Sequence, residues 1–159
     1  ARSEKSWSAS RWMGWAASRV CSTQRISAEN KIREKPIDIL CQGIGTSGHL
    51  ALNEPGDTDL NDARCVRVVT LVEQSKIQLR DDPNFRDLGY IPDKGISMTI
   101  PAMLTARYVY TMVPLALKKP ILTRLLQTLE PSEELPASII STVESLLFVD
   151  QDSCPDSLK

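Results

Sequence analysis

The stretch that most constrains the fold is Gly43 to Gly56, which reads GIGTSGHLALNEPG. It holds four of the chain's seven glycines and its only histidine, His49. It directly follows Ile37 to Cys41, an apolar run without a clear polar face, as expected of a buried strand in a parallel sheet. Glycines at the exit of a strand let the backbone turn sharply and let a ligand approach main-chain N–H groups. Because open α/β sheets bind ligands at the carboxyl ends of their strands, this turn is a candidate site.

Strand and helix patterns alternate along the rest of the chain. Runs rich in β-branched or apolar residues predict further strands at 65–71, 95–100, 107–113 and 145–150. Helical patterns cover 28–35, 73–82, 101–106, 117–129 and 136–142. This alternation predicts the α/β class, with a Rossmann-like, mostly parallel sheet and flanking helices.

Two of the connecting segments carry additional expectations. The helix at 117–129 has an apolar stripe, and Pro120 suits only a first turn, so the helix is expected to start near Lys118 or Lys119. Residues 83–94 are predicted to form a loop long enough to cover a site as a moving lid. The stripe consists of Leu117, Ile121, Leu125 and Leu129, widened by Leu122 and Leu126.

Composition excludes several classes of protein. A chain of 159 residues with 42% hydrophobic residues suffices for one modest domain. A net charge of -1 argues against nucleic acid or an anionic membrane as a partner. No apolar run approaches the roughly 20 residues that span a bilayer. Four cysteines without CxxC spacing, and one histidine, make a zinc site unlikely. Cys41 and Cys65 lie in strand-like runs and are expected to be buried free thiols in a reducing compartment.

The chain is expected to divide into three parts. Residues 1–27 form an atypical Trp/Ser/Arg-rich segment that holds all three tryptophans. Its acid-poor composition suits an organelle transit peptide, and equally a divergent terminus without function. Residues 28–150 form the α/β domain, and residues 151–159 form a polar tail that is expected to fray.

The glycine turn resembles the active-site signature of the glucosamine-6-phosphate deaminase (isomerase) family. The family pattern is GxDGHxAFNEP, and here it stands as GTSGHLALNEP, at residues 45–55. The resemblance extends more loosely from about Asn30 to the end, and it covers the C-terminal half or so of the family domain. The same superfamily contains 6-phosphogluconolactonases, which usually lack the NEP segment, so Asn53, Glu54 and Pro55 favour the deaminase branch.

The resemblance implies roles for individual residues. The reaction opens the ring of glucosamine 6-phosphate, shifts a proton between C1 and C2, and leaves fructose 6-phosphate and ammonia. His49 matches the ring-opening acid/base, a task that suits a pKa near neutrality, and Glu54 matches the carboxylate that pairs with it. The remaining implied substrate contacts are Gly45, Gly48, Asn53, Lys118 and Arg80, the last two toward the phosphate.

The sequence departs from the family pattern in two places. Ser47 stands where the deaminases have an aspartate, so one charge of the relay that supports His49 is absent. The family's proton-shifting aspartate and its phosphate loop lie upstream of the matched region, and nothing in residues 1–36 matches them. Catalysis by this chain alone is therefore doubtful. A non-catalytic sugar-phosphate binder, an inactive truncated paralogue and a 6-phosphogluconolactonase stay open as alternatives.

The resemblance also bears on ligands and location. It implies a small-molecule sugar phosphate as substrate, with no cofactor and no metal. It leaves a homo-oligomer open. A cytoplasmic location is expected, with organelle targeting by the N-terminal segment as the alternative.

Overall fold

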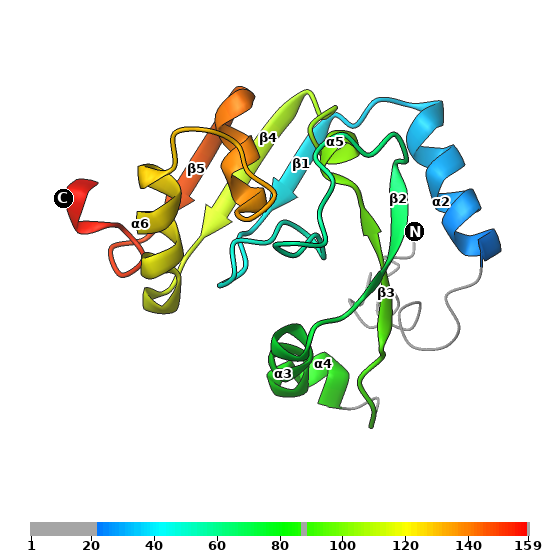
Figure 1. The fold of residues 1–159 in the computed structure, drawn as a ribbon, viewed down its shortest axis with the longest axis horizontal. Coiled ribbons are helices and arrows are strands. Elements are labelled where there is room, and N and C mark those ends of the chain that lie inside the picture. Colours follow the sequence, from blue (N-terminus) through cyan, green and yellow to red (C-terminus); the bar gives the residue numbers. More distant parts are fainter. Residues whose placement is uncertain (1–21, 87–88, 159) are drawn as a thin grey trace, which may run out of the picture.

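The computed structural model describes residues 22–86 and 89–158 (Figure 1). The transit-peptide hypothesis concerns residues that lie almost entirely outside these ranges. The first described element, helix α2 (Ser22–Glu34), already begins inside the segment expected to be atypical. Glu29 anchors this helix, because its carboxylate pairs with Arg25 and Arg33 and accepts the backbone N–H of Cys65. The hydrogen bond from Arg33 is the main reason why the pKa of Glu29 lies below its usual value.

Three strands form a parallel sheet in the order β1-β4-β5. They are β1 (Ile39–Gln42), β4 (Tyr108–Val113) and β5 (Ser145–Val149), close to the ranges that the sequence predicts. Helix α6 (Lys119–Gln127) and the 3-10 helix η2 (Pro136–Thr142) connect β4 to β5 and cover one face of this sheet (Figure 1). The α/β architecture and the parallel sheet are thus confirmed.

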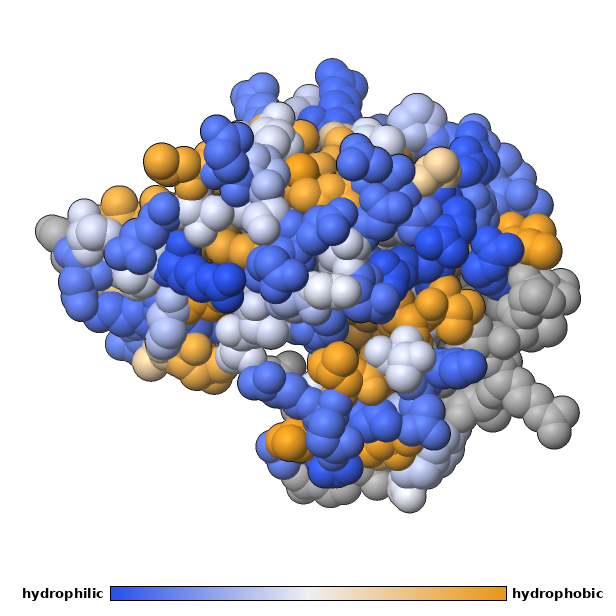
Figure 2. Space-filling model, in the orientation of Figure 1, coloured by the Kyte–Doolittle hydropathy of each residue, from blue (hydrophilic) through white to orange (hydrophobic). Residues whose placement is uncertain are grey.

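The other two strands do not join that sheet. Strands β2 (Val66–Thr70) and β3 (Lys94–Met98) pair antiparallel with each other as a separate ribbon. Helices α3 (Glu73–Asp81) and α4 (Pro83–Arg86) connect the two strands at the far end of the ribbon, where Figure 1 shows them apart from the parallel sheet. The loop expected at 83–94 therefore begins as a helix. Figure 2 shows an indentation between this helical pair and the rest of the molecule.

The main core lies between the parallel sheet and its helices. Short helix α5 (Ile100–Met103) begins at Thr99, whose hydroxyl accepts the N–H of Ala102, with Pro101 in the first turn as expected. Buried residues from the glycine turn, α5, β4, α6 and η2 make up this cluster: Ile44, Leu50, Ile100, Met103, Val113, Ile121, Leu122, Leu125, Leu135, Ala137 and Ile140. The glycine turn is therefore packed into the core of the domain.

The apolar stripe of α6 is shorter than the sequence predicts. Ile121, Leu122 and Leu125 are buried, as expected. Leu117 and Leu129 are exposed, because η1 (Ala116–Lys118) precedes the helix and α6 ends at Gln127. Side chains beyond the two ends of α6 no longer follow the helical spacing, so they do not point to the same side as the stripe.

Strand β1 is not buried on both faces, which corrects the expectation for Ile37 to Cys41. Ile39 and Cys41 are exposed, and Cys65 is only partly buried, so neither thiol is a core residue. The face of the parallel sheet opposite α6 carries no described element. Helices cover both faces in the usual parallel sheet, whereas the helices within residues 22–86 and 89–158 cover only one.

The C-terminal residues do not fray within the described range. Ser153 is fully buried, and its N–H and hydroxyl bond to Asp150. The 3-10 helix η3 (Asp156–Leu158) follows, and Lys119 pairs with Asp156 across 2.6 Å. Within residues 22–86 and 89–158, no helix has both the length and the apolar character needed to cross a membrane.

Candidate active site

The glycine turn folds back on itself through two main-chain hydrogen bonds. The Gly45 N–H donates to the His49 carbonyl (3.0 Å), and the Gly48 N–H donates to the Gly45 carbonyl (2.9 Å). Gly48 has φ +91°, a conformation that side chains disfavour, and a Cβ there would lie 2.3 Å from Leu135. The Gly48 carbonyl accepts the N–H of Ala137, which fixes the turn to η2. Gly48 thus has a structural reason to be glycine.

The His49 ring lies directly against Gly45. A Cβ on Gly45 would stand 1.7 Å from both Cδ2 and Nε2 of the imidazole, so any side chain there would displace the ring. His49 Nδ1 lies 2.7 Å from the Ala51 carbonyl. Because a carbonyl oxygen only accepts, Nδ1 carries a proton, and in the neutral ring Nε2 is the basic nitrogen. The geometry therefore selects Nε2 for acid/base chemistry.

A pocket of about 350 Å³ opens at the carboxyl ends of β1 and β4. This volume suits a small metabolite. Residues directly after β1 form one wall, and residues at the end of β4 form another. Ala51 and Lys118 complete the lining. The lining residues are Gly43, Ile44, Gly45, His49, Ala51, Met112, Val113, Pro114 and Lys118. The pocket thus lies at the exits of two neighbouring parallel strands, the edge of the sheet at which the sequence predicts a candidate site.

Lys118 brings a cation to this pocket. It is the residue directly before α6, as expected, and its Nζ donates to the Ile44 carbonyl (2.8 Å). Partial burial lowers the pKa of Lys118 from its usual 10.5. An ammonium at the start of a helix favours a bound anion, because the positive end of the helix dipole adds to its field.

Glu54 does not contact His49. Its two carboxylate oxygens accept hydroxyl hydrogen bonds, Oε2 from Ser47 (2.7 Å) and Oε1 from Ser75 (2.5 Å). Its backbone carbonyl accepts from Thr58 (2.7 Å). The carboxylate is buried and does not line the pocket. The position that holds an aspartate in the family pattern is thus occupied by Ser47, whose neutral hydroxyl donates to Glu54.

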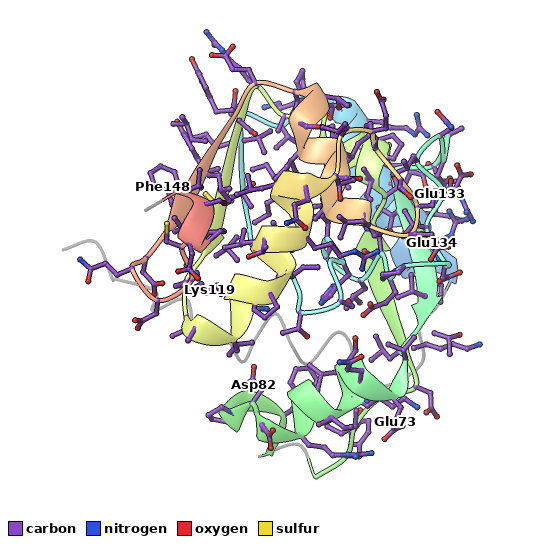
Figure 3. All side chains as sticks on the ribbon, turned by 60° about the vertical axis from the view of Figure 1, so that its left-hand side comes forward. Glu73, Asp82, Lys119, Glu133, Glu134 and Phe148 are labelled. Atoms are coloured by element: carbon purple, nitrogen blue, oxygen red, sulfur yellow. The ribbon has the colours of Figure 1, made fainter. Side chains whose placement is uncertain are left out.

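Two further predicted contacts lie away from the pocket. Asn53 is 1% exposed, and its amide donates to the carbonyls of Leu50 and Met98, both at 2.9 Å. Arg80 is exposed on α3, where it pairs with Glu73 (2.8 Å). Figure 3 shows Glu73 on the α3–α4 unit, apart from Lys119 at the start of α6. The structure thus brings together Gly45, His49 and Lys118, and places the remaining residues around them or elsewhere.

Two features near the site have no signal in the sequence. Ser75 lies in α3, 21 residues after Glu54, within an ordinary polar helix sequence. Leu115 has φ +83°, a strained value for leucine, and its N–H donates to Asp150 (2.9 Å). This turn directly follows Pro114 of the pocket wall, so β5 supports the turn that leads to Lys118.

Comparisons with known proteins identify relatives of this chain. A glucosamine-6-phosphate deaminase of Staphylococcus epidermidis is 35% identical over 133 residues, which cover 81% of this chain and 52% of that protein. A deaminase of the same name from Geobacillus is 28% identical over 118 residues, which cover 74% of this chain and 45% of that protein. No family model matches the chain.

Solved structures show the same relationship. A monomeric glucosamine-6-phosphate deaminase superposes with a TM-score of 0.73 at 26% identity, over 86% of this chain and 54% of that one. A 6-phosphogluconolactonase of Thermotoga maritima superposes with a TM-score of 0.55 at 22% identity, over 80% and 50%, and so shares the fold.

The parallel sheet and its glycine turn define the α/β class in which sugar-phosphate deaminases and phosphogluconolactonases share one fold. Within this class, the chain belongs to the glucosamine-6-phosphate deaminase family. It spans about half the length of the curated relatives that it matches.

Proposed function

We propose that the chain binds glucosamine 6-phosphate and performs the ring-opening part of the deaminase reaction. The observation that carries the proposal is that His49 and Lys118, a basic ring nitrogen and a cation, line one pocket at the carboxyl ends of β1 and β4. The family relationship supplies the substrate class, because the relatives are named for the same amino-sugar phosphate.

Ring opening needs one group that both accepts and donates a proton. In the proposed step, His49 Nε2 takes the proton of the sugar's C1 hydroxyl and returns a proton to the ring oxygen as the bond between C1 and that oxygen breaks. The second ring proton stays on Nδ1, which donates a hydrogen bond to the Ala51 carbonyl. This bond holds the ring in position throughout the step. Lys118 binds the phosphate, so that C1 is held toward the histidine.

The later proton shift from C2 to C1 needs a second base. No carboxylate is among the described residues that line the pocket. Glu54 is buried, and both of its oxygens already accept hydrogen bonds from serine hydroxyls. The proposal therefore assigns to this chain substrate binding and ring opening, and assigns the shift and ammonia release to a group outside the described residues.

A second candidate function is sugar-phosphate binding without turnover. It is favoured by the position of Glu54, which supports the turn through Ser47 and does not assist His49. Lactonase activity on 6-phosphogluconolactone is a weaker candidate, because Asn53, Glu54 and Pro55 follow the deaminase pattern.

Two assays test the proposal. Calorimetric titration with glucosamine 6-phosphate is expected to show binding that weakens in Lys118→Met, with Lys119→Met as the matched control. Release of ammonia and fructose 6-phosphate is then measured for wild type and His49→Ala. Binding without product supports the second candidate, and absence of binding refutes both. Turnover that persists unchanged in His49→Ala refutes the role of the histidine.

A further inference from the structure

The Ala51 carbonyl, which meets the His49 ring, belongs to a tight turn directly after the histidine. The turn is closed by the Asn53 N–H, which donates to the Leu50 carbonyl (2.9 Å). Ala51 has φ +52°, in the left-handed region that side chains disfavour. Turns closed by such a bond differ from one another in the direction of their middle peptide group. Here that group joins Ala51 to Leu52, and its direction decides what His49 Nδ1 meets.

The opposite edge of the same peptide group is held by Ser97 of β3, which runs beside the turn (Figure 1). The Leu52 N–H donates to the Ser97 hydroxyl oxygen (3.2 Å). The N–H and C=O of a trans peptide group lie in one plane and point in opposite directions. A bond that fixes the N–H toward β3 therefore also fixes the Ala51 carbonyl toward His49.

The Ser97 hydroxyl is arranged to accept from this peptide group. Its single proton is donated to the Met98 carbonyl (2.9 Å), and the side chain is 3% exposed. If the peptide group turned over, the hydroxyl would have to leave Met98 to meet the turned carbonyl. The turned N–H would face His49 Nδ1, which would then have to accept, and the proton of the neutral ring would lie on Nε2. Ser97 thus favours one peptide direction and, with it, one tautomer of His49.

Asn53 and Gly95 reinforce this attachment of the turn to the ribbon. The Asn53 amide nitrogen donates to the carbonyls of Leu50 and Met98, so one buried side chain ties the turn to β3. A Cβ on Gly95 would lie 2.7 Å from Leu52 Cδ1, so the Leu52 side chain also packs closely on β3. Hydrogen bonds and packing therefore hold the same two-residue segment from one strand.

We propose that Ser97 is a positioning residue for His49. Through the Ala51–Leu52 peptide group, it keeps the proton of the neutral imidazole on Nδ1 and leaves Nε2 free to accept a proton. Ser97 is buried and is not among the residues that line the pocket, so it acts without touching a ligand there. The inference rests on the proposed function for the role of Nε2, whereas the tautomer is a property of the free protein.

The test is the tautomer of His49, measured from the ¹⁵N chemical shifts of its two ring nitrogens in the full chain without ligand. His49 is the only histidine, so the signals are unambiguous. At about pH 8.5, where an ordinary histidine is neutral, we expect a protonated Nδ1 and an unprotonated Nε2. In Ser97→Ala, the ratio of this tautomer to the other should fall about 2–10-fold, as for loss of one hydrogen bond. A wild-type ring with its proton on Nε2 would overturn the proposal, whether or not the variant folds.

Two further variants separate positioning from a general loss of stability. Ser97→Thr keeps the hydroxyl and should restore the wild-type tautomer ratio. Thr99→Val removes another buried hydroxyl, which bonds to the Arg64 carbonyl and the Ala102 N–H and not to the turn. It should lower stability and leave the tautomer ratio unchanged. A ratio that stays at the wild-type value in Ser97→Ala, or that falls equally in Thr99→Val, would also overturn the proposal.

Ala51→Gly tests the same peptide group in a variant that is expected to fold, because glycine adopts a positive φ without strain. With Ser97 in place, we expect the wild-type tautomer and slow hydrogen exchange of the Leu52 amide. Loss of the tautomer would show that the Ala51 side chain, and not Ser97, sets the peptide direction. In turnover assays, kcat should fall in Ser97→Ala and recover in Ser97→Thr, with KM little changed. A wild-type chain that shows the expected tautomer but forms no fructose 6-phosphate would count against the proposed reaction alone.

Discussion

The Ser47 hydroxyl donates a 2.7 Å hydrogen bond to the carboxylate of Glu54. This pair joins two positions of the signature, the one where the family pattern has aspartate and the glutamate of the NEP segment. Ser75 completes the arrangement from α3. Glu54 thereby connects the glycine turn to the ribbon that carries α3, and its direct contacts are structural.

The first prediction concerns this network. Ser75→Ala removes one of two hydroxyl donors from a buried carboxylate, and we expect a loss of about 1–3 kcal/mol in the free energy of unfolding. Ser47→Ala should cost a similar amount. Urea denaturation followed by circular dichroism measures both. The exposed Ser157→Ala serves as the control, within about 0.5 kcal/mol of wild type. A Ser75 variant as stable as this control would contradict the network.

The second prediction concerns Gly45. Gly45→Ala pushes a methyl group into the imidazole of His49, and we expect a loss of about 1–3 kcal/mol from overpacking together with a displaced ring. His49 is the chain's only histidine, so its imidazole proton signals in NMR spectra are unambiguous. Gly43→Ala is the control, because its Cβ would meet its nearest atom at 3.4 Å. Unchanged His49 signals in Gly45→Ala would show that the ring lies elsewhere.

The third prediction concerns the pH dependence at Lys118. Its folded pKa lies below the usual 10.5 because of burial, so the unfolded chain binds the proton more readily between the two values. The contribution of Lys118 to the free energy of unfolding therefore rises with pH between the two pKa values. Lys118→Met should remove this rise. Denaturation from pH 7 to 11 measures it, with Lys119→Met as the control. A rise that persists in Lys118→Met would contradict the assignment.

The same residue should govern anion binding. Phosphate binding by Lys118 requires the ammonium form, so affinity should fall as pH rises through the lowered pKa. We expect Lys118→Met to bind glucosamine 6-phosphate about 10–100-fold more weakly, as for loss of a charge-assisted hydrogen bond. Titration calorimetry at pH 7 measures this. Equal affinities in the two proteins would remove Lys118 from the site.

The fourth prediction concerns Leu115. Its φ of +83° costs about 1–3 kcal/mol, and a glycine adopts this conformation without strain. Since glycine loses about 0.5–1 kcal/mol in chain entropy, Leu115→Gly should stabilise the protein by about 1 kcal/mol. Leu117→Gly, in the neighbouring η1, should destabilise it instead. Thermal denaturation separates the two, and a destabilised Leu115→Gly would show that the leucine side chain matters more than the strain.

The local sequence suffices to predict most of the elements and the pocket. All five β-branched or apolar runs are strands, and the glycine turn after β1 forms the pocket wall. Local patterns do not determine how strands pair. Residues 65–71 read like the other strands, yet β2 pairs antiparallel with β3 outside the parallel sheet. That choice depends on contacts distant in the sequence.

The finer site geometry could not be predicted for a similar reason. Ser75 approaches Glu54 only because α3 is carried back by the ribbon, and the Ala51 carbonyl takes the place beside His49 that a carboxylate was expected to occupy. The exposure of β1 was mispredicted because an apolar strand indicates that a face will be covered.

We propose that His49 and Lys118 share one sugar-phosphate site. The most direct measurement is an NMR titration of the single imidazole with glucosamine 6-phosphate, beside a parallel titration with glucosamine. We predict saturable shifts of the His49 signals with the phosphorylated sugar, which weaken in Lys118→Met and are far smaller with glucosamine. His49 signals that do not respond to glucosamine 6-phosphate, or that respond equally in Lys118→Met, would show that the two residues do not share a sugar-phosphate site.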